Sequence, residues 1–550
     1  MSLWGAIQDS FGGIVFDPVA HGLIVPSKPP RSAGGVKSVA TLLEPMVRAA
    51  PDKAILIGRN GRLTAAQLDQ QANQVANMLM SLGVKAGDRV AASLPNDVGI
   101  VVAFLGAMRI GAIWLGINRP LAAPEKAYML RDSQTTVFIG DTAMSDQVKS
   151  QQSELPDLRH IIVSEPGVND ELTSMIAAAS SDRVSVEIDP LAPAAIAYTS
   201  GTTGFPKGAV HSQHNLLLPG AVGTFRSKMT EPVANPVLGV PLPLTILNLM
   251  VLGPLSAYQS DTVMVAMDRV DGLGMGEWIH KEKITTFAAV PAMVYDLLTH
   301  PEVSDEMLKS VAAIGVGGAD MPDAFRRLYE ERFGKRVSTG YGLTEAPTSV
   351  TSEDVTKPPV AGTCGSALPQ VSIHILDDDG NELPVGEVGE VCVGPSTEGE
   401  FADTYRPMLG YWNKPEESAR ALRGGLLHTG DIGCMDEDGN VFIKDRKNDL
   451  IIRGGANVYP AEVERVIHDV QGVAACAVIG VPNERLGEIV VAFVEPAPGA
   501  TVDPAAIQQH CAANLARYKV PEQIHVIEAF DRTPMGKIRK TTLREKLRNS

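Results

Sequence analysis

The segment from Tyr198 to Ser212 contains the residue types that bind phosphate groups. Hydroxyls, glycines and a lysine follow one another closely in it: Thr199, Ser200, Gly201, Thr202, Thr203, Gly204, Lys207 and Gly208. Glycine lets the backbone approach a ligand, and hydroxyls with free N–H groups can surround phosphate oxygens. Lys207 would add a mobile positive charge. The pattern predicts a loop that binds nucleotide phosphates, and the alternative is a solvated loop without a ligand.

The spacing of this loop excludes the commonest phosphate-binding motif. A Walker motif places Ser or Thr directly after its lysine, whereas Gly208 follows Lys207 here. The preceding residues, 194–198, form a short apolar run that predicts a buried strand. We therefore expect the loop to open at a strand end, where α/β proteins bind ligands.

Other segments of the chain carry side chains suited to the same chemistry. They are residues 340–345, 428–431, 445–449, 454–460 and 532–537. Together with the phosphate loop, and in this order, they resemble the motifs of the adenylate-forming superfamily, which includes acyl-CoA synthetases, peptide-synthetase adenylation domains and beetle luciferases. The resemblance covers most of the chain from about Val39 onward.

The resemblance implies a site for ATP and magnesium. Tyr341 would lie against the adenine, and Glu345 would hold Mg²⁺ that bridges the phosphates, because a hard cation prefers carboxylate oxygen. Further nucleotide contacts are implied for Gly318, Ala319, Gly342 and Thr344. The resemblance also counts Thr344 and Glu345 among the catalytic residues. The alternative for Tyr341 is an ordinary core aromatic.

The resemblance assigns Asp431 and Arg446 to the ribose. Asp431 can accept hydrogen bonds from two neighbouring ribose hydroxyls, and Arg446 can donate to the sugar or to phosphate. Alternatively, Thr429-Gly430-Asp431 is a common turn and Arg446 pairs with Asp445. Their occurrence on either side of a turn at Gly439 favours the nucleotide role.

Lys537 is the implied catalytic lysine. Pro534 and Gly536 hold it on a loop, so its ammonium could enter a cleft between domains and bridge the substrate carboxylate and the α-phosphate. The resemblance places the hinge between domains at Lys447 and Asn448. Asn448 departs from the Lys or Asp that the superfamily usually has there.

The acyl pocket departs further from the superfamily. By resemblance its wall includes Leu244, Thr245, Val316, Gly317, Gly318 and Gly342. Relatives often place an aromatic and a histidine after Pro241-Leu242, and the branch that activates amino acids has an Asp nearby. Residues 238–251 contain neither feature. We therefore expect a roomy apolar pocket for an acid with an uncharged tail, such as a fatty, branched, cyclic or aryl acid.

Composition limits the kinds of partner and the cellular compartment that we expect for this protein. The net charge of −16 argues against nucleic acid, since phosphate neutralisation needs a basic face. The dispersed cysteines (Cys364, Cys392, Cys434, Cys476 and Cys511) indicate neither a disulfide framework nor a zinc site. Residues 98–108 are apolar but too short to span a bilayer, so they predict a buried helix. We expect a cytoplasmic protein without an integral membrane segment. The sequence does not decide whether it forms a homodimer.

The order of predicted elements indicates an α/β fold. Strands alternate with helices between residues 54 and 316, which implies parallel sheets covered on both faces. Residues 364–446 carry short strands separated by Asp-Gly turns and predict a small antiparallel β-subdomain. We expect an N-terminal adenylation domain, residues 1–446, with two parallel-type α/β subdomains and this β-subdomain. Residues 447–550 would form a mobile small α+β C-terminal domain.

These patterns favour an ATP-dependent acyl-CoA ligase. The acid would react with Mg·ATP to give acyl-AMP and pyrophosphate, and the thiol of coenzyme A would then displace AMP. One alternative is an acyl-AMP ligase that delivers to a carrier protein. A second is a nucleotide-binding protein without catalysis. An oxygenase of luciferase type is less favoured, because no residue selects that chemistry.

Overall fold

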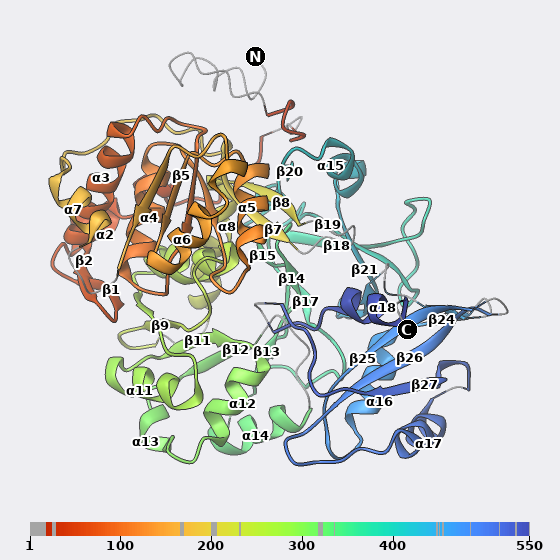
Figure 1. Ribbon diagram of the computed structural model, residues 1–550. Helices are drawn as coiled ribbons and strands as arrows, with labels where there is room; N and C mark the ends of the chain where they lie inside the picture. The colour runs from red at the N-terminus through yellow and green to blue at the C-terminus, as the bar shows by residue number, and fades with distance from the viewer. Residues whose placement is uncertain are drawn as a thin grey trace. The chain divides into compact units, whose positions relative to one another are not determined.

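The computed structural model in Figure 1 describes most of the chain. The described residues are 18–24, 29–165, 170–199, 206–229, 233–316, 323–334, 336–446, 449, 451–453, 456–483, 486–515, 517–533 and 536–548. They fall into two units. The first comprises Met1–Val360, Gly365–Ile373 and Val393–His428, and the second comprises Ala361–Cys364, His374–Cys392 and Thr429–Ser550.

The first unit contains two large sheets with mainly parallel strands. One sheet has the order β13-β12-β11-β9-β10-β1-β2. Its strands are β13 (Ser338–Thr339), β12 (Ala313–Val316), β11 (Thr286–Ala289), β9 (Val237–Val240), β10 (Val263–Ala266), β1 (Ala54–Gly58) and β2 (Gly61–Thr64). Neighbours pair in parallel except for the β1–β2 hairpin.

The other sheet carries the predicted phosphate loop. Its order is β20-β8-β7-β4-β3-β5-β6. Its strands are β20 (Gly410–Tyr411), β8 (Lys207–Ser212), β7 (Pro193–Thr199), β4 (Ile113–Gly116), β3 (Arg89–Ser93), β5 (Val137–Gly140) and β6 (His160–Val163). From β7 to β6 the strands are parallel, whereas β8 and β20 are antiparallel to their neighbours.

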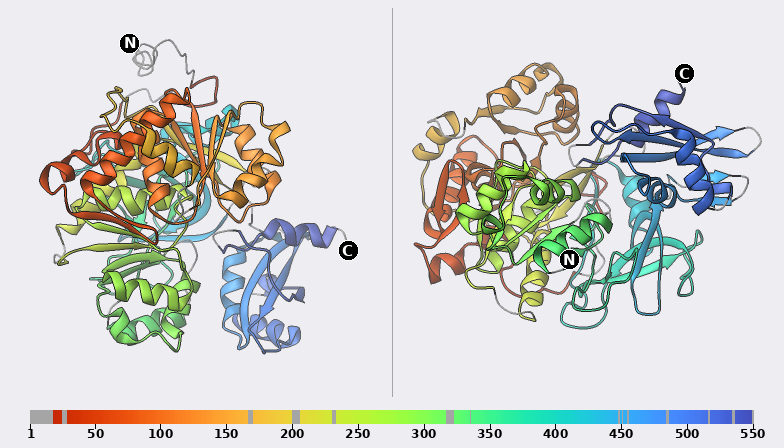
Figure 2. Two further views of the ribbon diagram at one scale, coloured as in Figure 1. Left: turned by 60° about the vertical axis from the view of Figure 1, so that its left-hand side comes forward. Right: turned by 90° about the horizontal axis from the view of Figure 1, so that it is seen from below.

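Helices cover both faces of each sheet. The cluster between the sheets joins β1 and β10 to β3 and β4 through α3 (Ala65–Ser81), α4 (Val98–Arg109) and α8 (Gln213–Ser227). α5 (Ala123–Asp132) and α6 (Thr142–Lys149) cover the outer face of the second sheet. Figures 1 and 2 show α11 (Gly272–Glu282), α12 (Pro291–Thr299) and α14 (Asp323–Phe333), in green, packed on the outer face of the first sheet. The predicted parallel sheets with two covered faces are confirmed.

α3 illustrates how the sequence sets an element. Thr64 caps it: the hydroxyl accepts from the Gln67 N–H at 3.2 Å, and the Gln67 side chain accepts from the Thr64 N–H at 3.0 Å. Leu68, Val75 and Leu79 recur on one face and are buried. The capping box and the apolar stripe are both sequence features typical of an amphipathic helix.

Shorter elements complete the first unit. The helical ones are η1 (Val39–Thr41), α2 (Glu44–Ala49), η2 (Gln152–Glu154), α7 (Glu171–Ala178), α9 (Leu247–Met250), η3 (Val251–Leu255), α10 (Ser256–Gln259), α13 (Asp305–Leu308), α15 (Pro415–Ala421) and η4 (Arg423–Gly425). The short strands are β14 (Gly342–Leu343), β15 (Thr348–Ser349), β16 (Thr351–Ser352) and β17 (Ser366–Ala367).

The predicted β-subdomain corresponds to a smaller sheet. Its order is β18-β19-β21-β22, with β18 (Val371–Leu376), β19 (Gly389–Pro395), β21 (Leu427–Met435) and β22 (Val441–Arg446). β21 and β22 pair antiparallel. Residues 429–446 belong to the second unit, so this unit begins before the boundary that we expect at residue 447. The boundary of any moving domain therefore stays a prediction.

The rest of the second unit is the predicted α+β fold. The sheet order is β24-β23-β26-β25, and β27 pairs with β26. The elements are β23 (Ile451–Arg453), β24 (Ala456–Val458), α16 (Pro460–His468), β25 (Val473–Asn483), β26 (Gly487–Pro496), α17 (Pro504–Asn514), η5 (Arg517–Lys519), β27 (Gln523–Val526) and α18 (Lys540–Arg548). α16 and α17 pack on one face of the sheet, and α18 packs on the other.

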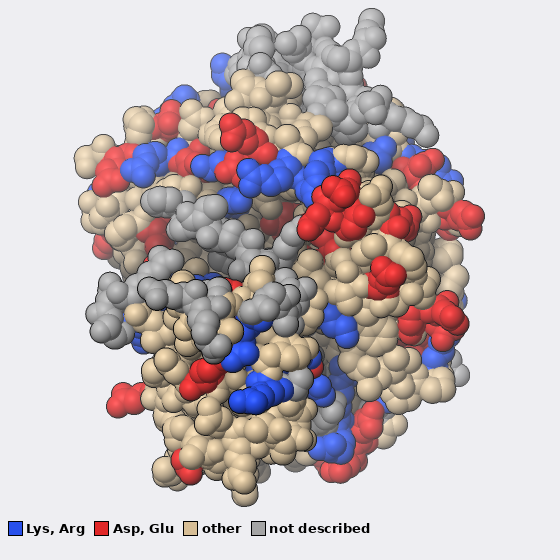
Figure 3. Space-filling model, turned by 90° about the vertical axis from the view of Figure 1, so that its right-hand side faces the viewer, with Lys and Arg blue, Asp and Glu red and all other residues tan. Residues whose placement is uncertain are grey.

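Two further observations concern membrane-spanning helices and the distribution of charged side chains on the surface. No helix in the described part of the chain has the length and apolar composition that crossing a bilayer requires. On the face shown in Figure 3, Lys and Arg side chains occur beside Asp and Glu side chains.

Candidate functional site

The predicted phosphate loop is the connection of a β-hairpin. β7 ends at Thr199 and β8 begins at Lys207, and these two residues are register partners. The Thr199 hydroxyl donates to the Lys207 carbonyl at 3.4 Å. The predicted phosphate contacts between them, Ser200, Gly201, Thr202 and Thr203, lie outside the described residues. The structure thus brings Thr199 and Lys207 together at the mouth of the loop.

Helix α5 holds both ends of this hairpin connection. The Tyr128 hydroxyl donates to the Pro206 carbonyl at 3.1 Å, and the Tyr198 hydroxyl donates to the Asp132 carboxylate at 2.6 Å. Burial raises the pKa of Asp132, while the hydrogen bond from Tyr198 opposes that rise. Burial and the nearby Asp132 carboxylate raise the pKa of Tyr198 well above its usual value. Tyr198 therefore stays protonated and keeps donating.

The segment around Tyr341 is shaped by close backbone packing. The Tyr341 N–H donates to the Thr351 hydroxyl at 3.0 Å, and the Tyr341 carbonyl accepts from the Val350 and Thr351 N–H groups. A Cβ on Gly340 would lie 2.5 Å from the Thr351 carbonyl oxygen, and one on Gly342 would lie 2.3 Å from that of Thr348. These glycines are therefore required by the adjacent chain. The role of half-buried Tyr341 against adenine stays a prediction.

Thr344 is tied to β8 by a buried histidine. His211 Nε2 lies 2.8 Å from the Thr344 carbonyl oxygen, and Nδ1 lies 3.4 Å from the Asn215 amide nitrogen. A carbonyl can only accept, so Nε2 carries the hydrogen and Nδ1 accepts from Asn215. Burial lowers the pKa of His211 to about 4. The neutral ring therefore holds the candidate catalytic segment against the phosphate hairpin.

Glu345 is hydrogen-bonded to β20 and to the residues just before that strand. Its carboxylate accepts from the Tyr411 hydroxyl at 2.8 Å, and its carbonyl accepts from the Met408 N–H at 2.8 Å. Both Glu345 and Lys207 are half-buried. The Lys207 ammonium lies over the ring of the same tyrosine, 5.4 Å from its centroid. Carboxylate oxygen suits Mg²⁺ and an ammonium suits phosphate, and both roles stay predictions.

The loop after β9 is clamped by two asparagines. The Asn96 amide donates to the Leu242 carbonyl at 2.8 Å and its oxygen accepts from the Leu244 N–H at 2.8 Å. The Asn118 oxygen accepts from the Thr245 hydroxyl at 2.9 Å. Leu244 and Thr245 are both buried, and Leu244 belongs to the core between the sheets.

The predicted acyl pocket is described only in part. Val316 is buried and Gly342 is exposed, whereas Gly317, Gly318 and Ala319 lie outside the described residues. The pocket wall, including Leu244 and Thr245, stays a prediction.

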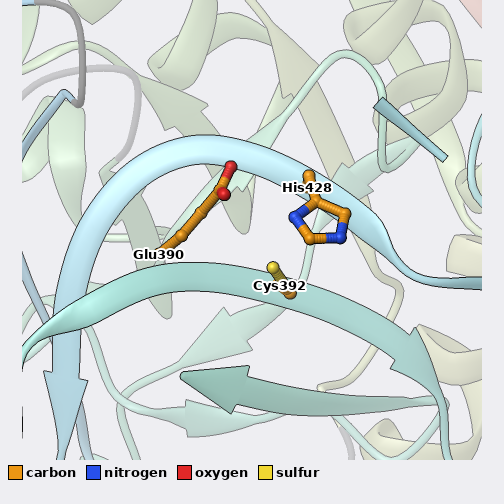
Figure 4. Close-up of side chains that lie close together, drawn as sticks. All are labelled: Glu390, Cys392 and His428. Atoms are coloured by element: carbon orange, nitrogen blue, oxygen red, sulfur yellow. The ribbon is translucent and has the colours of Figure 1, made fainter. Parts of the chain in front are cut away.

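In the second unit, Asp431 lies in strand β21, next to hydrogen bonds made by its own backbone and that of Gly430. The Asp431 N–H donates to the Thr429 hydroxyl at 3.1 Å, and the Gly430 N–H donates to the Glu390 carboxylate at 3.2 Å. Figure 4 shows Glu390 beside Cys392 on β19. Asp431 is buried and pairs in register with Arg446 across the β21–β22 hairpin. The backbone thus brings the two predicted ribose residues together.

Lys537 lies on an exposed turn. The Thr533 N–H donates to the Lys537 carbonyl at 2.7 Å, and the Lys537 N–H donates to the Thr533 hydroxyl at 3.2 Å. Gly536 has φ +76°, which favours glycine. This agrees with the expected loop, and the catalytic role stays a prediction. The predicted hinge residues Lys447 and Asn448 lie outside the described part of the chain.

Family models match both parts of the chain. The model described as AMP-binding enzyme matches residues 43–401, and the model described as AMP-binding enzyme C-terminal domain matches residues 462–537. The chain belongs to the AMP-binding enzyme family. Its resemblance to the adenylate-forming superfamily is therefore confirmed.

Relatives of this AMP-binding enzyme include ligases with different acceptors. It is 35% identical to the long-chain-fatty-acid–CoA ligase FadD13 of Mycobacterium tuberculosis, over 88% of this chain and 93% of that protein. It is 32% identical to the fatty acid–[acyl-carrier-protein] ligase ScoC of Streptomyces coeruleorubidus, over 88% of this chain and 91% of that protein. The structure of ATP-bound MatB from Rhodopseudomonas palustris matches with TM-score 0.83 and 29% identity, over 93% of this chain and 99% of that one.

Sequence reasoning missed the residues that hold the candidate site residues in place. His211 lies inside the phosphate segment, but its type gives no sign of a bond to Thr344. Tyr411 lies in the short strand β20 and Glu390 lies near the start of β19, and neither residue belongs to a chemical motif. Only the fold shows that they contact Glu345 and Gly430.

Proposed function

We propose that this AMP-binding enzyme is an ATP-dependent carboxylic acid–CoA ligase. A carboxylate oxygen of the acid attacks the α-phosphorus of ATP, and pyrophosphate leaves as the P–O bond to it breaks. The thiol sulfur of coenzyme A then attacks the acyl carbon, loses its proton, and AMP leaves. The family membership supports the first step, and relatives that are CoA ligases support the second.

The single observation that carries the proposal is the gathering of charged groups in the first unit. Lys207 is the first residue of β8. Glu345 accepts a hydrogen bond from Tyr411, which lies in the neighbouring strand β20. Lys207 would pair with phosphate, and Glu345 would hold Mg²⁺, which would neutralise phosphate charge when bound. Lys537 would supply the ammonium that stabilises the attack on phosphorus.

The acid that we propose has an uncharged tail. The segment that begins within β9, residues 238–251, contains no acidic residue that could pair with a substrate amine. The clamp from Asn96 and Asn118 fixes this segment in place. Coenzyme A is the proposed acceptor. A carrier protein is the second candidate, favoured by the 32% identity to ScoC.

The test is pyrophosphate exchange into ATP across a panel of fatty, branched, cyclic and aryl acids. Exchange with at least one acid is expected, and CoA-dependent release of AMP should follow with that acid. Glu345→Gln should abolish exchange, whereas Glu398→Gln, at an exposed position, serves as the matched control. AMP release only with a carrier protein would replace the CoA assignment. A lack of exchange with every acid would favour a nucleotide-binding protein without catalysis.

A further inference from the structure

Tyr411 contacts both charged groups of the proposed phosphate site. Its hydroxyl donates to the Glu345 carboxylate at 2.8 Å. The Lys207 ammonium lies over its ring, 5.4 Å from the centroid. One side chain therefore links the start of β8 to the carboxylate that would bind Mg²⁺.

The backbone around Tyr411 is fixed on several sides. Tyr411 is the register partner of Ala209 in the β20–β8 pair, which Figure 1 shows beside β7. The Tyr411 N–H donates to the buried Ser418 hydroxyl at 2.8 Å, and the Trp412 N–H donates to the Gly208 carbonyl at 2.8 Å. A phenol on so constrained a backbone presents its hydroxyl in a fixed place.

A carboxylate that binds a cation benefits from such a partner. The free carboxylate has several rotamers, and a hydrogen bond to one oxygen selects the rotamer that leaves the other oxygen for the metal. Loss of this kind of outer partner typically weakens metal binding or activity by about 10–100-fold. The neighbouring Met408 N–H, which binds the Glu345 carbonyl, fixes the backbone of the same residue.

We propose that Tyr411 is a positioning residue that orients Glu345 for Mg²⁺ and couples it to Lys207. This rests on the proposed function insofar as Glu345 is the Mg²⁺ ligand. Tyr411 takes no part in bond making. Its hydroxyl acts through Glu345, and its ring holds Lys207 at the mouth of the phosphate loop.

The decisive variant is Tyr411→Phe, which keeps the ring beside Lys207 and removes only the hydroxyl. Calorimetric titration of the full chain with a non-hydrolysable ATP analogue, with and without Mg²⁺, separates the two contacts. We expect metal-free affinity to stay unchanged and affinity with Mg²⁺ to fall by about tenfold. Equal affinity of Tyr411→Phe and the unsubstituted protein in the presence of Mg²⁺ would overturn the proposal.

Two further proteins sharpen this test. Glu345→Asp shortens the carboxylate so that it no longer reaches the hydroxyl, and adding Tyr411→Phe to it should then cause little further loss. Full additivity would show that Tyr411 acts elsewhere. Tyr258→Phe removes another buried hydroxyl, in α10, and should bind the analogue normally.

The binding readout is independent of the proposed reaction. If the unsubstituted protein catalyses no exchange and Tyr411→Phe still weakens Mg²⁺-dependent binding, the positioning role stands and the ligase proposal fails. If exchange occurs and Mg²⁺-dependent binding is unaffected, the ligase proposal stands and the positioning role fails.

Discussion

Acid should destabilise the protein through one buried histidine, His211. Its neutral ring donates to the Thr344 carbonyl and accepts from the Asn215 amide. Protonation would place a hydrogen on Nδ1, facing the Asn215 donor, and would leave a charge in the core. Burial accordingly lowers the pKa of His211 from 6.5 to about 4.

The sign and size of the effect follow from this difference. The unfolded chain takes up the proton near pH 6.5, while the folded protein resists it until about pH 4. The stability from the neutral ring is therefore present above pH 6.5 and is lost as the pH falls toward 4. The whole loss is about 3 kcal/mol, and about 2 kcal/mol of it falls between pH 7.5 and 5.0.

Urea unfolding at pH 7.5 and pH 5.0 measures this loss. His211→Gln keeps one donor and one acceptor but does not titrate, so its stability should fall by about 2 kcal/mol less than that of the unsubstituted protein. The difference between the two proteins removes the contributions of carboxylates common to both. His280→Gln, at an exposed position of α11, should behave like the unsubstituted protein. The same pH dependence in His211→Gln would refute the reasoning.

Two other substitutions test the proposed chemistry and the packing behind it. Lys537→Ala should slow adenylate formation by about two to three decades while sparing thioester formation from preformed acyl-adenylate. Lys546→Ala, at an exposed position, should change neither rate. Equal loss of both half-reactions in Lys537→Ala would disprove the assignment. Gly116→Ala would bring a Cβ to 1.9 Å from the Thr245 carbonyl oxygen and should cost about 3 kcal/mol of stability, as measured by thermal unfolding. Gly99→Ala, in α4 with open space around it, is the matched control, and a similar effect in both would contradict the packing argument.

Local patterns sufficed for much of the fold. The apolar run at residues 98–108 forms the predicted buried helix, α4, and the run at residues 194–198 lies within β7. α3 lies between its caps, Thr64 and Leu82. These elements have strong periodicity, clear flanking signals, or both. β4 and β8 were not predicted, because β4 follows closely on the apolar helix α4 and β8 begins at the glycine-rich loop, so neither strand differs in pattern from its neighbourhood.

The site was predictable only where a residue carries its own chemistry. Lys207, Glu345 and Asp431 have charged side chains in motifs that resemble the superfamily. His211 and Tyr411 act through contacts across 133 and 66 positions of chain, which no local pattern encodes. The glycines beside Tyr341 are required by the carbonyls of Thr348 and Thr351, which a Cβ at either position would overlap, and no local pattern shows this contact.

The position of α4 limits how the chain could be shortened. From Ile100 to Arg109 every residue of this helix is buried, and its cluster takes in strands of both large sheets. A fragment that kept one sheet and lost the other would expose apolar side chains of α4 to water. A large exposed apolar surface promotes aggregation. A truncated form of this enzyme should therefore contain both large sheets of the first unit, with its ends outside them.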